Sequence, residues 1–124
     1  MILDTSAWVE LIEGTERGRV ARSILEREES FTSLATIAEL AQWCLRSGRE
    51  DVAPTVEDVK RSSRILPLTE TISIVAGKLN HERKKGGKKW GMIDSIILAT
   101  AQVYGLRILT KDYAFRDLPD ARIL

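Results

Sequence analysis

Four acidic residues stand out in this sequence, because each lies close to an apolar run that could place it at the edge of a sheet. They are Asp4, Glu39, Asp94 and Asp112. Carboxylates that are brought together repel one another, and a divalent cation removes that conflict. Carboxylate oxygens suit Mg²⁺ or Mn²⁺, whereas zinc usually recruits histidine or cysteine. Divalent ions held in this way promote phosphodiester hydrolysis, so the pattern indicates a metal-dependent nuclease.

The composition excludes several other kinds of active site. The single cysteine, Cys44, excludes an internal disulfide and a cysteine-rich zinc site. The single histidine, His81, leaves little material for a Ser–His–Asp triad, and a solvated side chain is the simpler interpretation in the polar stretch HERKK. The net charge of +1 does not by itself indicate a nucleic-acid-binding protein. A chain of 124 residues, 44% of them hydrophobic, suits one compact domain over residues 1–124.

The start of the chain and its apolar runs bear on location. The first three residues form an apolar strand candidate that is followed at once by Asp4, so no signal peptide is predicted. No apolar run approaches the ~20 residues that cross a bilayer. We therefore expect a cytoplasmic protein that is not bound to a membrane.

Short apolar strands alternate with amphipathic helices along the chain. The expected strands cover residues 1–3, 30–33, 65–68, 106–109 and 122–124. The expected helices cover residues 7–13, 18–27, 36–47, 56–63, 70–84 and 94–104, and Thr5 or Ser6 is expected to cap the first of them. Strands that alternate with helices pair in parallel. The expected fold is therefore α/β, a three-layer α/β/α sandwich with a five-stranded parallel sheet.

The four acids fall at one edge of this predicted sheet, where ligands bind in open α/β folds. Asp4 follows the first strand, Asp112 follows the fourth, Asp94 opens the helix before the fourth, and Glu39 lies early in the helix after the second. Each acid also has a purely structural interpretation. Asp4 could cap a helix, Asp94 could favour a helix dipole, and Asp112 could be a turn residue. Glu39 could complete a capping box with Thr36, so only the joint placement favours a shared site.

The segments around these acids resemble the PIN-domain nucleases, especially the VapC toxins of VapBC toxin–antitoxin pairs. The resemblance runs from MILDTSAWVEL through SLATIAELAQW and MIDSIILATAQVYGLRILTKDYAF to LPDARIL. The family has an aspartate after the first strand, a glutamate in the helix after the second, an aspartate opening an alanine-rich helix, and a Thr-x-Asp with a nearby phenylalanine. Asp4, Glu39, Asp94 and Thr110-Lys111-Asp112 with Phe115 fill these positions in order.

The resemblance implies a Mg²⁺- or Mn²⁺-dependent endoribonuclease that is usually a homodimer. As a toxin it would be paired with a small antitoxin lying across the active groove. The four acids would be the catalytic and metal-binding residues, with Asp112 at a second metal or positioning water. The hydroxyls of Ser6 and Thr110 would support the site. The role of Asp117 stays open, with a solvated turn the simpler interpretation.

A basic segment ahead of the third acid could hold RNA. Its candidate RNA-binding residues are Arg83, Lys84, Lys85, Lys88 and Lys89. Two glycines would make the segment mobile, and Trp90 could stack on a base. A solvated helix end with Gly86 as its cap explains the segment equally well. Trp8 and Trp43 lie on apolar helix faces and are expected in the core or at an interface.

Other functions stay open at this point. A PIN-fold nuclease of RNA processing would need no antitoxin, and a PIN fold could also serve as a non-catalytic RNA- or protein-binding module. A receiver-type signalling domain would need an acid pair after the first strand, where Asp4 stands alone. A phosphatase using Asp4 as nucleophile would need a second aspartate where Ser6 stands. The last two functions are therefore disfavoured.

Overall fold

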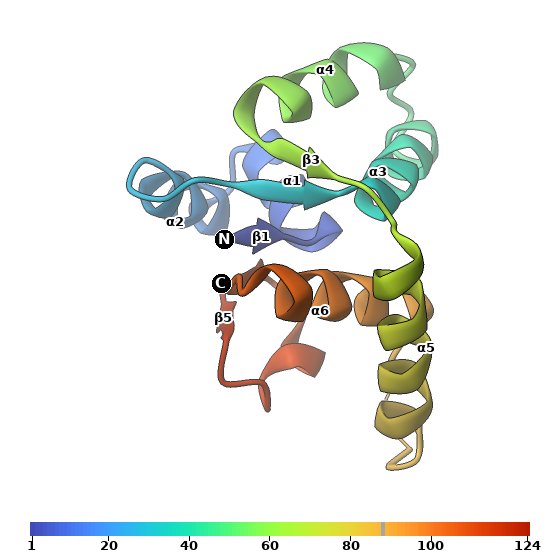
Figure 1. The fold of residues 1–124 in the computed structure, drawn as a ribbon. Coiled ribbons are helices and arrows are strands. Elements are labelled where there is room, and N and C mark those ends of the chain that lie inside the picture. Colours follow the sequence, from blue (N-terminus) through green and yellow to red (C-terminus); the bar gives the residue numbers. More distant parts are fainter. Residues whose placement is uncertain (88) are drawn as a thin grey trace.

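Short parallel strands form one sheet in the computed structural model, which describes residues 1–87 and 89–124 (Figure 1). The strands are β1 (Ile2–Leu3), β2 (Phe31–Ser33), β3 (Arg64–Leu66), β4 (Ile108–Thr110) and β5 (Ala121–Ile123). Their order in the sheet is β3-β2-β1-β4-β5, and every pairing is parallel. The predicted five-stranded parallel sheet is confirmed.

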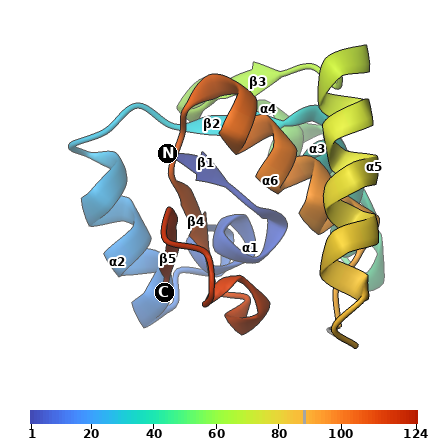
Figure 2. The same ribbon diagram turned by 60° about the horizontal axis from the view of Figure 1, so that its bottom comes forward.

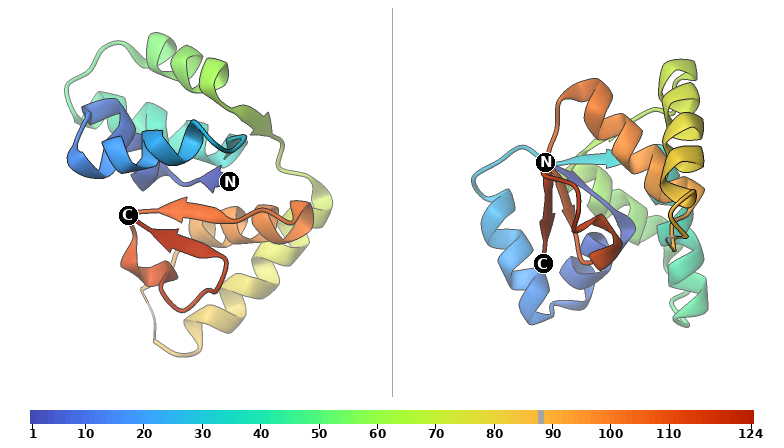
Figure 3. Two further views of the ribbon diagram at one scale, coloured as in Figure 1. Left: turned by 90° about the vertical axis from the view of Figure 1, so that its left-hand side faces the viewer. Right: turned by 90° about the horizontal axis from the view of Figure 1, so that it is seen from below.

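Helices cover both faces of the sheet. They are α1 (Thr5–Glu13), α2 (Glu16–Leu25), α3 (Leu34–Arg46), α4 (Val52–Ser62), α5 (Glu70–Lys84), α6 (Met92–Tyr104) and the short 3-10 helix η1 (Tyr113–Phe115). The first four lie on one side of the strands, and α5 and α6 lie on the other (Figures 2 and 3). This arrangement is the expected three-layer α/β/α sandwich. None of the helices in the described part of the chain is long and apolar enough to cross a membrane.

The alternation of side chains along the strands divides the core into two parts. Leu3 and Leu109 are paired in register and point into the cluster shared with α1 to α4. Ile2 and Ile108 are also paired, and they point into the opposite cluster, which holds Ile97 of α6. All four strand residues are at most 1% exposed. Strands this short and apolar are typical of a parallel sheet that is covered on both faces.

Two helix starts differ from the sequence-based expectations. Asp4, not Thr5 or Ser6, is the N-cap of α1, because its carboxylate accepts a hydrogen bond from the Ala7 amide. The third helix starts at Leu34 with Ser33 as its N-cap, two residues before the expected start. Other ends agree with prediction: glycines with positive φ end α1 and α6, and β3 stops just before Pro67.

Candidate active site

The sheet topology creates a crevice beside the central strand. From β1 the chain moves outward to β2 and β3, and it then returns to the other side of β1 to form β4 and β5. Ligands of α/β folds bind where the strand order reverses in this way, beyond the carboxyl ends of the strands. Asp4 follows β1, and Thr110 is the last residue of β4, so both lie at this switch point.

Asp4 is the most buried of the four acids, at 6% exposed, and hydroxyl groups surround its carboxylate. Ser6 Oγ donates to Asp4 Oδ1 at 2.7 Å, and Thr110 Oγ1 donates to Asp4 Oδ2. The two hydroxyls lie 3.2 Å apart. The hydroxyls predicted to support the site therefore contact the carboxylate that they were expected to serve.

The other three acids enter the site from three further elements. The carboxylate of Asp94, in the first turn of α6, accepts a hydrogen bond from the Gly91 amide at 3.0 Å. Asp112 caps η1 by accepting from the Ala114 amide at 2.9 Å, and its own amide donates to Thr110 Oγ1. Glu39, in α3, accepts a hydrogen bond from the hydroxyl of Thr5.

One cleft of about 410 Å³ is lined by all four predicted acids. Burial raises the pKa of Asp4 to about 6, and a smaller raising effect comes from the charge of Asp94. Burial also raises the pKa of Asp94, and the charges of Asp112 and Glu39 raise it further. The four carboxylates therefore lie within electrostatic reach of one another in a partly dry site, where their ionised forms are disfavoured.

The structural alternative for Glu39 is wrong. A capping box with Thr36 requires Thr36 to be the N-cap of its helix. Thr36 instead lies inside α3, is fully buried, and has a hydroxyl without a hydrogen-bond partner. Glu39 is thus in the second turn, where its side chain reaches the cleft and Thr5 rather than its own helix start. The local role of a helix cap belongs to the three aspartates.

The carboxylates do not form a ready-made metal cage. Within residues 1–87 and 89–124, no group of three or more histidine, cysteine, aspartate or glutamate side chains is arranged to hold an ion as it stands. Local donors explain this arrangement, since Glu39 faces Thr5, Asp94 faces the Gly91 amide and Asp112 faces the Ala114 amide. Rotation about side-chain bonds would be needed before the acids shared a ligand.

Two further residues of the cleft, Glu10 and Lys111, were not singled out from the sequence. Glu10 is 5% exposed, and Lys111 Nζ lies 2.7 Å from its carboxylate. The hydrogen bonds from Lys111 and Thr15 lower the pKa of Glu10. The available signals were the place of Lys111 between Thr110 and Asp112, and the place of Glu10 one turn after Ser6 on the same helix face.

The basic segment is less exposed than expected at two positions. Trp90 is 5% exposed and donates to Ser95 Oγ at 2.6 Å, so the expectation that it stacks on a base is wrong. The guanidinium of Arg83 lies over this ring, 3.8 Å from its centroid, and it also binds the Asp117 carboxylate and the Ala114 carbonyl. Asp117 is therefore a partner of Arg83 and not simply a solvated turn residue.

The remaining basic candidates divide into two groups. Lys84, Lys85 and Lys89 are exposed, whereas Lys88 lies outside the described residues. Lys89 and Trp90 line a second hollow of about 510 Å³, which Asp94 and Asp112 also line. The two hollows share these aspartates, so the acids lie on a saddle that is open on both sides.

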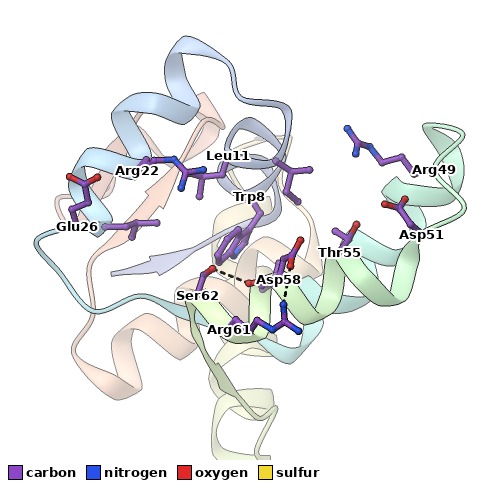
Figure 4. Close-up of a pocket in the computed structure, with 13 residues that line it drawn as sticks. Trp8, Leu11, Arg22, Glu26, Arg49, Asp51, Thr55, Asp58, Arg61 and Ser62 are labelled. Carbon is purple, nitrogen blue, oxygen red and sulfur yellow. Dashed lines mark hydrogen bonds and ion pairs between the residues drawn. The ribbon is translucent and has the colours of Figure 1, made fainter.

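A larger groove of about 740 Å³ lies between α1, α2 and α4 (Figure 4). Trp8 and Leu11 of α1 provide apolar surface, and Arg22 of α2 faces Asp58 and Arg61 of α4 across the groove. Trp8 donates its indole N–H to Thr32 at 3.0 Å and is otherwise buried, as its predicted place in the core requires. This groove holds none of the four acids, so it is a separate surface.

Comparisons with known proteins agree on the architecture. A family model described as PIN domain matches residues 1–121. The chain is similar to a toxin–antitoxin complex from Klebsiella pneumoniae, with 24% identity, a TM-score of 0.76 and coverage of 98% of this chain and 94% of that chain. It is also similar to DNA-bound VapBC from Salmonella typhimurium, with 25% identity, a TM-score of 0.77 and coverage of 99% and 95%.

A third solved structure is described as a toxin that cleaves the sarcin–ricin loop. It is VapC20 of Mycobacterium tuberculosis, with 16% identity, a TM-score of 0.76 and coverage of 95% of this chain and 94% of that chain. No curated protein matches the sequence. The structural likenesses extend over nearly the whole of both chains, and they place the observed fold among toxin structures.

Proposed function

Because the chain belongs to the PIN domain family, we propose that it is a metal-dependent endoribonuclease and the toxin of a toxin–antitoxin pair. The observation that carries this proposal is the meeting of four carboxylates from four separate parts of the chain in one cleft. Structural demands alone explain the position of each aspartate, but they do not explain why all of them and Glu39 line the same hollow.

The donor set fits a hard divalent cation, since it consists of carboxylate oxygens without histidine or cysteine. Asp4, Glu39, Asp94 and Asp112 would hold Mg²⁺ or Mn²⁺. The raised pKa values of Asp4 and Asp94 show the cost of gathering these groups without a counter-charge. When bound, such cations would neutralise the acids, polarise the phosphodiester and activate water.

The chain's own residues would orient this chemistry. Ser6 and Thr110 fix both oxygens of Asp4, which keeps one carboxylate in place while its neighbours turn toward a shared ligand. Asp112 follows Thr110 directly and is exposed, so it is the acid best placed to meet water that enters the cleft. Hydrolysis would add this water to phosphorus and release a ribose oxygen that takes up a proton.

The test is RNA cleavage by the purified chain with either metal. The substitution Asp94→Asn removes one charge while keeping the hydrogen-bonding shape of the side chain. We expect it to lower cleavage of single-stranded RNA by about 100-fold or more, because charge at a reacting centre is worth that much. Asp58→Asn is the matched control, since Asp58 is an exposed acid on α4, outside the cleft.

Two results would contradict the proposal. One is an absence of cleavage by the wild-type chain with both Mg²⁺ and Mn²⁺. The other is equal cleavage by the Asp94→Asn and wild-type chains, which would leave the fold as a binding module.

A small protein partner is the second part of the proposal. The solved structures from Klebsiella pneumoniae and Salmonella typhimurium are toxin–antitoxin assemblies. In this chain the groove between α1, α2 and α4 supplies an apolar floor with charges of both signs at its rim (Figure 4). A segment with an apolar face and flanking charges would fit such a surface. A small reading frame beside the gene would supply the partner, and its absence would favour an RNA-processing nuclease.

A homodimer and a cytoplasmic location stay predictions of the sequence, as does RNA binding by the lysines near residue 85.

A further inference from the structure

The ion pair between Glu10 and Lys111 is asymmetric in its exposure. The side chain of Glu10 is 7% exposed, and that of Lys111 is 47% exposed. The carboxylate therefore lies inside the protein, and the ammonium stands toward solvent at the surface of the cleft. An ammonium has three N–H donors, and this contact with Glu10 uses one of them.

Glu10 is held from a second direction, which makes it a firm anchor. The hydroxyl of Thr15, the N-cap of α2, donates to the other oxygen of the Glu10 carboxylate. Gly18 of α2 packs directly against the Glu10 backbone, so closely that a Cβ at position 18 would overlap the Glu10 carbonyl oxygen. The carboxylate therefore has a fixed place between α1 and α2.

Helix α1 holds residue 111 at both its backbone and its side chain. The Lys111 amide donates to Ser6 Oγ at 2.9 Å, while Lys111 Nζ binds Glu10 one turn further along the helix. Ser6 also donates to Asp4, so the same hydroxyl joins Lys111 to the acidic centre. The position of the ammonium relative to the four acids is thus fixed by contacts at both ends of the residue.

Charge explains why a fixed cation is needed here. The cleft gathers five carboxylates, those of Glu10 and the four predicted acids, and a polyanion is repelled by such a surface. Among the described residues that line it, Lys111 and Arg46 are the cationic side chains. Lys111 is the one tied to the active-site strand end, directly between Thr110 and Asp112.

We propose that Lys111 is a substrate-binding residue whose ammonium, held by Glu10, binds a backbone phosphate of the nucleic acid next to the one that is cleaved. This inference rests on the proposed nuclease function and assigns a phosphate subsite within that cleft. Lys111 neutralises part of the substrate's charge at a place that the acids cannot serve.

The test is the salt dependence of binding to a short fluorescein-labelled single-stranded RNA. All variants are made in the Asp94→Asn chain so that the probe stays intact, with Mg²⁺ present. Each lost phosphate contact lowers the slope of log affinity against log salt by about 0.7 for single strands. We expect Lys111→Met to weaken binding about tenfold at low salt and to lower the slope by that amount. Lys111→Arg should restore the slope.

A second pair of variants separates phosphate binding from a merely structural contact. Glu10→Gln breaks the same ion pair but keeps the lysine, so we expect it to leave the slope unchanged. The double variant Glu10→Gln/Lys111→Met leaves no unpaired buried carboxylate, and it should show the reduced slope even where Lys111→Met alone folds poorly. Lys60→Met is the charge control, because Lys60 pairs with Glu57 on α4, away from the cleft.

The outcomes are distinguishable. If Lys111→Met and the double variant keep the slope of the Lys60→Met control, or if Glu10→Gln lowers the slope as much as Lys111→Met, the phosphate subsite is wrong. Cleavage by the wild-type chain would then leave the nuclease function standing. If the wild-type chain neither binds nor cleaves RNA, the nuclease function fails, and the subsite fails with it.

Discussion

Asp4 shows how one side chain can serve the fold and the site together. It caps α1 through the Ala7 amide, and its two oxygens accept from Ser6 and Thr110. These hydrogen bonds stabilise the ionised form, but burial outweighs them and raises the pKa to about 6. A carboxylate in this state is costly to ionise, and a cation in the cleft would offset that cost.

The raised pKa predicts how stability depends on pH in the absence of metal. The unfolded chain loses the Asp4 proton near pH 3.8, whereas the folded chain holds it to about pH 6. The contribution to stability is therefore complete below about pH 3.8 and is lost as the pH rises through about 6, by roughly 3 kcal/mol in total. Asp4→Asn does not titrate, so its stability relative to wild type should rise by about that amount over the same range.

The measurement is urea unfolding in EDTA at several pH values. Asp58→Asn is the control and should follow the wild-type curve, because Asp58 is exposed on α4. A stability difference between Asp4→Asn and wild type that stays constant with pH would contradict the prediction.

At the scale of elements, helix starts gather at the active edge of the sheet. Asp4 caps α1, Asp94 accepts from the Gly91 amide at the start of α6, and Asp112 caps η1. The amide groups at the start of a helix carry partial positive charge, which favours a nearby carboxylate. The three aspartates are therefore stabilised singly by their own helices, although they repel one another as a group.

Prediction from sequence was limited mainly by competing caps. Thr36 and Glu39 match a capping box, but Ser33 offers an equivalent cap three residues earlier, and the buried end of β2 decides in its favour. Local pattern cannot decide between two good caps, because tertiary packing fixes where the helix begins. Likewise, nothing local distinguished Arg83 and Trp90 as packed residues from a basic arm with an aromatic platform.

The contacts of Arg83 predict a role in holding α5 to the segment after β4. Its side chain is 11% exposed and contacts Trp90, the Ala114 carbonyl and Asp117. Arg83→Met should lower the free energy of unfolding by about 2 kcal/mol, because it leaves buried partners without their hydrogen bonds. Arg61→Met, at an exposed ion pair, should change it by less than about 0.5 kcal/mol.

Urea unfolding measures the stability of both variants, and RNA binding measures the alternative role. If Arg83→Met is as stable as the Arg61→Met control but has a lower salt slope for RNA, Arg83 is a phosphate ligand as the sequence suggested.

At the scale of the whole molecule, the switch in strand order explains why distant residues meet. Asp4 and Asp112 are far apart in sequence, yet β1 and β4 are neighbours in the sheet. Alternating strands and helices were enough to predict a parallel sheet and the edge at which its ligands bind. The hollows on either side of the acids were not predictable, because they depend on side chains such as Trp43 and Trp90 packed from opposite layers.

The saddle between the two hollows predicts cleavage within a strand. Asp94 and Asp112 line both hollows, so a nucleic acid can continue in both directions from the acids. A covalently closed single-stranded RNA should therefore be cut at a rate within about threefold of the linear form of the same sequence. Gel electrophoresis of both substrates measures this directly. Cleavage of the linear form alone would mean that the site needs a strand end.

Gly18 links the two surfaces of the molecule. Its missing side chain allows α2 to lie against the Glu10 backbone, and α2 also provides one wall of the groove that contains Arg22. In genetic terms, position 18 is one at which almost any missense change adds atoms where none fit. A single allele there would disturb the lysine anchor and the partner groove together, although the residue contacts neither substrate nor partner. Among loss-of-function alleles of this gene, changes at Gly18 would mimic changes at the acids while leaving every acid in place.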